Sequence, residues 1–270
     1  MRKSGGVVLL FFLTLVAASG WFGWRWFAGL DGADAILIPD GRAYSRPDPT
    51  AYQRFLTAVV DDRGRVDYTK AVGTVRSDLD TYLEQAASAT PAVFDDDSQR
   101  LAFFINAYNA SVIAGVLHHW PIDSIDEVGP LHQFFRDRDY RIAGSTVSLH
   151  GFESRVIRRF DPRLHFALIC ASASCPPMSR EAYVAETLER QLESAAVAFI
   201  RDRRFNRYEP EEHTWYLSSI FKWYADDFGG EAQVRQMLRR YVTVTRHEPA
   251  HIVYLDYDWS LNTPETEPAL

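Results

Sequence analysis

The segment HFALICASASCPPMS, residues 165–179, holds the side chains of this sequence that are best suited to chemistry. It begins at His165 and contains the two cysteines of the chain, Cys170 and Cys175. A cysteine attacks as a thiolate, which a neighbouring base or a helix N-terminus favours. Because proline suits the first position of a helix, Cys175, which precedes two prolines, is predicted to cap a helix at the positive end of its dipole. This position would favour a reactive thiolate at Cys175.

Such a thiol needs a base, and His165 is the first candidate. Five extended residues after it would carry the chain about 17 Å away, so His165 reaches Cys175 only if the ASAS turn folds back along the preceding strand. His150, His118 and His119 are the other candidates. Two adjacent residues point about 100° apart on a helix, so His118 and His119 cannot both face one site.

A disulfide between Cys170 and Cys175 is the alternative. Two cysteines in an oxidising compartment are usually paired, and a bridge needs Cα atoms about 4.4–6.8 Å apart. The small residues between them permit that approach without requiring it. This alternative predicts a non-catalytic binding or structural module, and a third reading is a redox role that uses both cysteines in turn.

Two asparagines lie in a segment that is apolar nearly all round, residues 98–120, which predicts a buried helix with Ser98 as its cap. Asn106 and Asn109 are three residues apart and share a face. A buried amide costs about 1–3 kcal/mol if it is left unpaired. Both side chains are therefore expected to bond either the backbone of a neighbouring loop or a catalytic group and its pocket.

The remaining pattern predicts an α+β fold: a single, mostly helical domain with a small antiparallel sheet. A hairpin is predicted to turn at residues 143–145 and to run into a helix that carries Glu153. Apolar spacing and alternation predict further helices at 49–61, 74–89, 179–202 (capped by Ser179) and 231–242, strands at 165–170 and 251–262, and a strand followed by a helix at 213–230.

The N-terminal residues 1–27 are predicted to be a signal peptide or a membrane anchor. Arg2 and Lys3 precede an uncharged, mainly apolar stretch, an arrangement that places the body of the chain in the periplasm or at the cell exterior. Cleavage and anchoring in the inner membrane both remain open. Residues 28–49 are predicted to be a linker, 50–262 the folded domain and 263–270 a loose tail.

Composition argues against several classes of protein. The net charge is −7 and no dense basic stripe follows the N-terminus, so nucleic acid is not an expected partner. No phosphate-binding glycine loop, HExxH or CxxC pattern is present. The sequence therefore predicts neither a cofactor nor a metal.

Several segments resemble the domain-of-unknown-function 547 family over residues 50–262, among them AFFINAYNASVIAGVL, VSLHGFESRVIR and HFALICASASCPP. The resemblance implies a bacterial cell-envelope domain related to papain-like or transglutaminase-like thiol enzymes, and so a peptide, amide or thiol-peptide substrate. The matching positions are Cys175 as nucleophile, His165, Glu153, Asn106 and Asn109.

The chain departs from that pattern after the hairpin. Many relatives have Glu-His where this chain has Glu153-Ser154, and His150 stands where Asn or Asp is common. If that histidine were the base, this protein would be impaired. Glu153 is expected to orient an imidazole, or else to pair with Arg155, Arg158 or tyrosine hydroxyls.

Overall fold

The computed structural model describes residues 45–130, 133–158, 160–243 and 250–265. The chain divides into two compact units, residues 1–43 and 44–270, and every described residue belongs to the second. The predicted signal or anchor at 1–27 and the linker up to residue 44 lie outside the described residues, as does the tail beyond residue 265.

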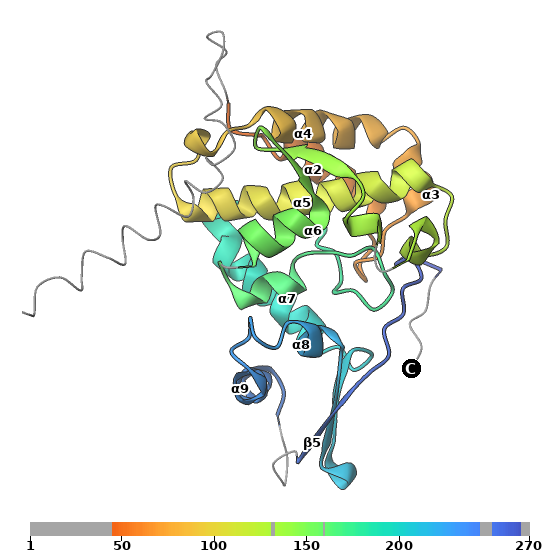
Figure 1. The fold of residues 1–270 in the computed structure, drawn as a ribbon, viewed down its shortest axis with the longest axis vertical. Coiled ribbons are helices and arrows are strands. Elements are labelled where there is room, and N and C mark those ends of the chain that lie inside the picture. The colour runs from red at the N-terminus through yellow and green to blue at the C-terminus, as the bar shows by residue number, and fades with distance from the viewer. Residues whose placement is uncertain (1–44, 131–132, 159, 244–249, 266–270) are drawn as a thin grey trace, which may run out of the picture. The chain divides into compact units, whose positions relative to one another are not determined.

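The described residues form helices, single helical turns and short strands (Figure 1). In chain order these are α2 (Thr50–Val59), α3 (Tyr68–Val72), α4 (Arg76–Ser88), η1 (Pro91–Val93), α5 (Asp97–His119), η2 (Ile125–Val128), η3 (Gln133–Phe135), β1 (Asp139–Ile142), β2 (Ser145–Ser148), α6 (Leu149–Phe152), the π-helical turn η4 (Glu153–Ile157), η5 (Pro162–Phe166), η6 (Ala185–Thr187), α7 (Leu188–Ile200), β3 (Asn206–Glu209), η7 (Pro210–Glu212), β4 (Thr214–Leu217), α8 (Ile220–Trp223), α9 (Glu231–Tyr241) and β5 (His251–Tyr254).

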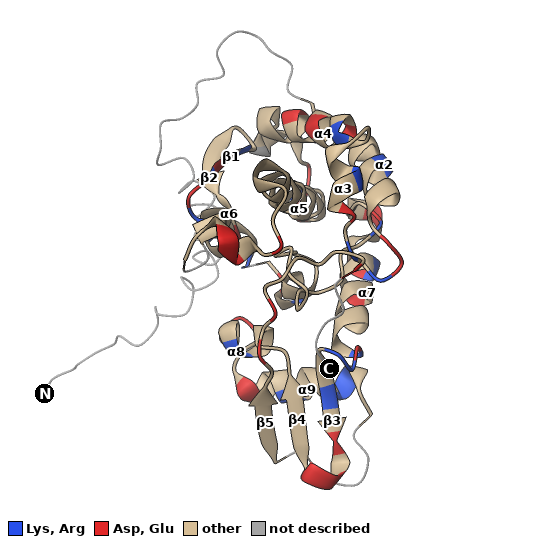
Figure 2. Ribbon diagram, turned by 90° about the vertical axis from the view of Figure 1, so that its right-hand side faces the viewer, with Lys and Arg blue, Asp and Glu red and all other residues tan. Residues whose placement is uncertain are grey.

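Helix α5 is the centre of the domain, as its apolar sequence predicts. Residues 101–117 are all buried, and Figure 2 shows the helix enclosed by α3, α4, α6 and the β1–β2 hairpin. Its cap is Asp96, whose carboxylate accepts a hydrogen bond from the Gln99 amide at 2.8 Å, so the prediction of Ser98 as cap is wrong by two residues. Among the described helices α5 is long and apolar enough to cross a membrane, but it is a core helix here.

The strands form two small sheets in the described part of the chain. β1 and β2 make the predicted hairpin, whose two-residue turn has positive φ at Ala143 (51°) and Gly144 (75°), the turn geometry that matches strand twist. β4 pairs antiparallel with β3 and parallel with β5. The α+β prediction is confirmed, although the second sheet is mixed and not purely antiparallel.

The segment around the cysteines differs from its prediction. Residues 165–170 are not a strand, because η5 ends at Phe166 and irregular backbone follows. No helix begins at Pro176, and Ser179 caps none, since α7 starts only at Leu188. The predicted dipole at Cys175 is therefore absent.

Side-chain amides explain why no helix forms before residue 185. Gln53 and Asn106 accept hydrogen bonds from the Ala182 and Tyr183 amides at 2.9 and 2.8 Å. Gln191 donates to the Ala182 carbonyl at 2.9 Å and accepts from the Val184 amide at 3.0 Å. These bonds take the backbone groups that a helix would have used, and they hold the segment extended.

Close packing of the hairpin against α5 predicts an unusual response to a glycine substitution. Gly115→Ala should raise helix propensity, yet its Cβ would lie 2.5 Å from Tyr140 Oη and 2.9 Å from Phe134 Cζ. We expect a loss of about 1–3 kcal/mol in the free energy of unfolding, measured in urea. Tyr140 Oη is buried and has no hydrogen-bond partner among the described residues, so Tyr140→Phe should cost little alone and should recover part of the loss in the double variant. Additive losses would contradict this packing.

Candidate functional site

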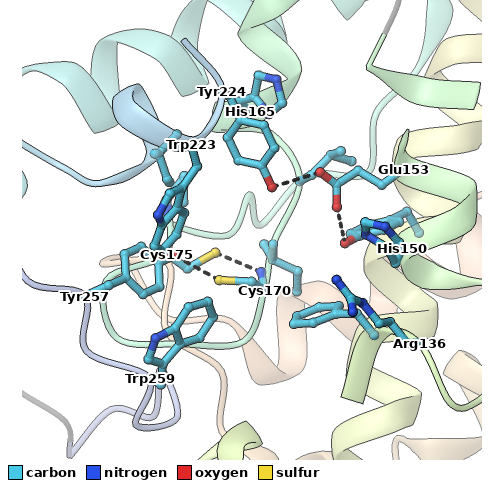
Figure 3. Close-up of a pocket in the computed structure, with 16 residues that line it drawn as sticks. Arg136, His150, Glu153, His165, Cys170, Cys175, Trp223, Tyr224, Tyr257 and Trp259 are labelled. Carbon is cyan, nitrogen blue, oxygen red and sulfur yellow. Dashed lines mark hydrogen bonds between the residues drawn. The ribbon is translucent and has the colours of Figure 1, made fainter. Parts of the chain in front are cut away.

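A cavity of about 340 Å³ lies where the cysteine segment meets α5, α6 and α8 (Figure 3). The described residues that line it combine thiols, a carboxyl, imidazoles, phenols and a guanidinium. They are Tyr108, Phe135, Arg136, His150, Glu153, His165, Leu168, Ile169, Cys170, Cys175, Pro176, Ile220, Trp223, Tyr224, Tyr257 and Trp259.

The Cys170 sulfur is surrounded by hydrogen-bonding groups. It lies 2.9 Å from Ser172 Oγ and 3.0 Å from Tyr257 Oη. The Cys175 thiol and the Ser172 amide also bond to it. A thiolate cannot donate, so in the ionised state all four groups donate to Cys170, which is partly exposed to the cavity.

Cys175 has the opposite surroundings. Its side chain is buried, with 4% of the residue's surface exposed, and its sulfur accepts the Cys170 amide at 2.8 Å. Both cysteines are free thiols in this structure, so the predicted disulfide is not formed in it.

The two thiols therefore differ in acidity. Burial alone would raise the pKa of Cys170, but the hydrogen bonds from Cys175, Ser172 and Tyr257 outweigh it and bring the pKa below its ordinary value. Burial, reinforced by the bond to Cys170 and by its charge, raises the pKa of Cys175 well above the ordinary value. The environment favours Cys170 as the thiolate, although the sequence pattern favours Cys175.

The loop between the cysteines is fixed by the C-terminal segment. Ala171 has a positive φ of 60°, and its carbonyl accepts the Asn262 amide at 3.1 Å. The Ala173 and Ser174 amides donate to carbonyls of Ser260 and Asp258 at 2.7 and 3.2 Å. These pairings hold a left-handed residue that would otherwise be strained, and they present the Cys170 sulfur to the cavity.

Glu153 faces the cavity from the π-helical turn η4. Its two carboxylate oxygens accept hydrogen bonds from Tyr108 Oη at 3.1 Å and Tyr224 Oη at 2.9 Å (Figure 3). Burial raises the pKa of Glu153, and these bonds together with the charges of Arg158 and His150 offset only part of that rise. Burial raises the pKa of Tyr108 and of Tyr224, and the charges of Glu153 and Cys170 add to that rise, so thiol and carboxyl act on the same two hydroxyls. Of the alternatives for Glu153, the structure shows the tyrosine pairing.

His165 lies behind Tyr224 as seen from the cysteines (Figure 3). Its ring stacks on Tyr224 at a centroid distance of 3.8 Å, and its Nε2 is 2.7 Å from Asp227 Oδ2. Asp227 also forms a bidentate pair with Arg158 at 2.5 and 2.8 Å. Burial lowers the pKa of His165 to about 4 even though Asp227 opposes the shift. No hydrogen bond joins His165 to a cysteine among the described residues, and of the other candidate bases only His150 lines the cavity.

The two predicted asparagines bind backbone, one of them beside the site. Asn109 donates to the Ala167 carbonyl at 2.9 Å and accepts the Ile169 amide at 3.0 Å. Asn106 makes the same pair of bonds to Tyr183, at 2.8 Å each. Neither side chain lines the cavity, but Asn109 fixes the residue that precedes Cys170.

Comparison with known families assigns part of the chain. Residues 94–200 match the family described as Protein of unknown function, DUF547. This central segment is therefore similar to the DUF547 family. No curated protein and no solved structure matches it. The DUF547 match is narrower than the predicted 50–262: it contains all five predicted site residues but ends before Tyr224 and Tyr257.

Several residues of the site were not singled out by the sequence. Tyr108, Ser172 and Tyr257 carry no motif of their own, and Cys170 is considered there only as a disulfide partner or as one of two redox cysteines. The segment FKWYADDF, which supplies Trp223, Tyr224 and Asp227, could be a ligand wall by its sequence, although such an aromatic stripe is more typical of core packing. The two adjacent acids, Asp226 and Asp227, were the available signal, because Asp is almost never fully buried unless it is paired.

The two asparagines allow a matched test of positioning. Asn109→Ala and Asn106→Ala should each cost about 2–4 kcal/mol in urea unfolding, because each leaves a backbone donor and acceptor unpaired. Only Asn109→Ala should also raise the pH midpoint of Cys170 alkylation, since it frees the backbone before Cys170. Equal midpoints in the two variants would mean that Asn109 is structural alone.

Stability should fall on acidification because of His165. Its folded pKa of about 4 lies below the 6.5 of an ordinary histidine, so the unfolded chain binds the proton more readily. The contribution is complete above about pH 6.5 and is lost as the pH falls to about 4, at most roughly 3 kcal/mol. When the free energy of unfolding is measured in urea between pH 7.5 and 4.5, it should depend less steeply on pH in His165→Gln than in the original protein. The exposed His251 on β5 supplies the control, and His251→Gln should keep the original pH dependence.

Proposed function

We propose that this protein is a cysteine-dependent enzyme that acts on an amide or peptide bond, with Cys170 as its nucleophile. The observation that carries the proposal is the set of donors around the Cys170 sulfur inside a cavity. A partly exposed thiol with a lowered pKa is a reactive cysteine. A purely structural cysteine needs neither the donors nor the cavity.

The reaction would proceed in two steps. The Cys170 thiolate attacks the carbonyl carbon, the amine leaves with a proton from an acid, and a thioester to Cys170 remains. Water or a second amine then attacks the thioester, which releases the acyl product and returns the thiol. Hydrolysis and transfer differ only in this second nucleophile. A thiol-peptide is a further candidate substrate.

Glu153 is the group best suited to carry the proton. Its pKa is raised towards the working range by burial, as a general acid requires. Tyr108 and Tyr224 hold both of its oxygens, and His150, which also lines the cavity, is close enough to influence its charge. His165 is instead a positioning residue. It is held by Asp227, and its ring stacks on Tyr224, which bonds Glu153.

The competing proposal is a non-catalytic envelope module with a Cys170–Cys175 disulfide. The contact between the Cys170 amide and the Cys175 sulfur supports it, because it brings the cysteines side by side. Export to the periplasm or cell exterior, by an N-terminal signal or inner-membrane anchor, belongs to both proposals and is supported by the charge and hydropathy of residues 1–27.

The test is alkylation and acylation of the full-length protein. Iodoacetamide labelling followed by peptide mass spectrometry should modify Cys170 before Cys175, with a pH midpoint below that of an ordinary thiol. p-Nitrophenyl acetate should give a burst of one nitrophenol per protein and an acetyl group on Cys170. Tyr257→Phe should raise the pH midpoint, because it removes one donor to the thiolate.

Cys175→Ala and Cys170→Ala are the matched controls. Cys175→Ala should keep the burst and Cys170→Ala should lose it. Labelling of Cys175 alone would restore it as the nucleophile, and a protein that resists labelling until it is reduced would favour the disulfide module.

A further inference from the structure

The cavity has two chemically different sides, with Cys170 between them (Figure 3). On one side Trp223, Tyr257 and Trp259 form an aromatic wall, with ring centroids 4.5–5.7 Å apart. Trp223 is 46% exposed, which is unusual for so large an apolar side chain. This wall suits an apolar or planar group of a ligand.

Arg136 and His150 lie on the other side (Figure 3). Arg136 follows η3 and is exposed. Its guanidinium makes no hydrogen bond or ion pair with any residue that the structure describes. Other arginines of the domain are bound bidentately, such as Arg158 to Asp227 and Arg163 to Asp161. Within the described part of the chain, no acceptor engages the five donors of this guanidinium, which lies at the edge of a cavity that contains a reactive thiol.

No carboxylate within the cavity pairs with this charge. Glu153 is the one lining carboxyl among the described residues, and both of its oxygens are engaged by Tyr108 and Tyr224. Arg136 thus keeps its positive charge available in a chain whose net charge is −7. Guanidinium binds carboxylate through two parallel hydrogen bonds, which fix orientation as well as adding affinity.

We propose that Arg136 binds a carboxylate of the substrate. The substrate class is then a peptide or other amide with a free carboxylate close to the bond that Cys170 attacks, and with an apolar or planar group against the aromatic wall. This inference rests on the proposed thiol chemistry and adds to it the charge and direction of the substrate.

Matched alkylating agents test the inference without a known substrate. The full-length protein is treated with N-bromoacetylglycine or with its uncharged amide, and with iodoacetate or iodoacetamide, and the rate at Cys170 is measured. With a free thiolate the carboxylate reagent has no advantage over its amide, because the thiolate and the carboxylate are both negative and repel each other. Here the carboxylate member of at least one pair should react about tenfold faster than its amide, the factor for one good charge-assisted contact.

Arginine variants separate the charge from the fold. Arg136→Gln should abolish the carboxylate preference, measured as the ratio of the two rates within each reagent pair, and Arg136→Lys should keep part of it. Arg138→Gln is the control, since Arg138 lies two residues on and stacks over Tyr140 outside the cavity lining. It should keep the full preference.

The outcomes separate the two proposals. Labelling of Cys170 with no carboxylate preference, or a preference that survives Arg136→Gln, overturns the role of Arg136 and leaves the thiol enzyme standing. Failure of every reagent at Cys170 removes the proposed function and this inference with it.

Discussion

The two hydrogen bonds of the Asn109 side chain connect the core of this protein to its chemistry. Asn109 belongs to a helix buried on all sides, where an unpaired amide would be costly, and its partners are the backbone groups of Ala167 and Ile169. The irregular segment before Cys170 has no ladder of its own to satisfy those groups. A single amide therefore satisfies both requirements, and the position of the thiol follows from the position of the helix.

From that anchor the segment passes into a loop whose backbone is paired with the C-terminal residues 258–262. The pairing places the two sulfurs in contact but in unequal surroundings: donors converge on Cys170, whereas Cys175 is enclosed. Two neighbouring groups of the same kind are thus driven apart in acidity, the arrangement by which proteins divide acid and base roles between identical side chains. Glu153, held between two phenols, faces the same space with a pKa shifted in the opposite direction from that of Cys170.

The sequence was informative where local pattern decides structure. The apolar length of α5, the turn at residues 143–144 and the helices α2, α4 and α9 follow from periodicity and turn chemistry, and the need of the buried asparagines for fixed partners follows from desolvation. The predictions for the cysteine segment and for the start of the following helix were wrong because both conformations depend on distant groups. Residues 258–262 pair with the loop between the cysteines. Asn106, Gln53 and Gln191 hold residues 182–184 extended. The assignment of His165 to Cys175 assumed a strand at residues 165–170. The choice between two thiols likewise needed Tyr257, which lies 87 residues from Cys170.

The family match and the folding unit do not have the same limits. The match ends at residue 200, yet Tyr224, Trp223, Tyr257 and Trp259 complete the cavity from beyond it. A fragment cut to the matched residues would keep both cysteines and Glu153. It would lose Tyr224, which bonds Glu153, and Tyr257, which bonds Cys170. It would also lose the backbone that pairs with the loop at Ala171. The candidate site is therefore assembled from two stretches of chain, and the residues that match the DUF547 family contain only part of it.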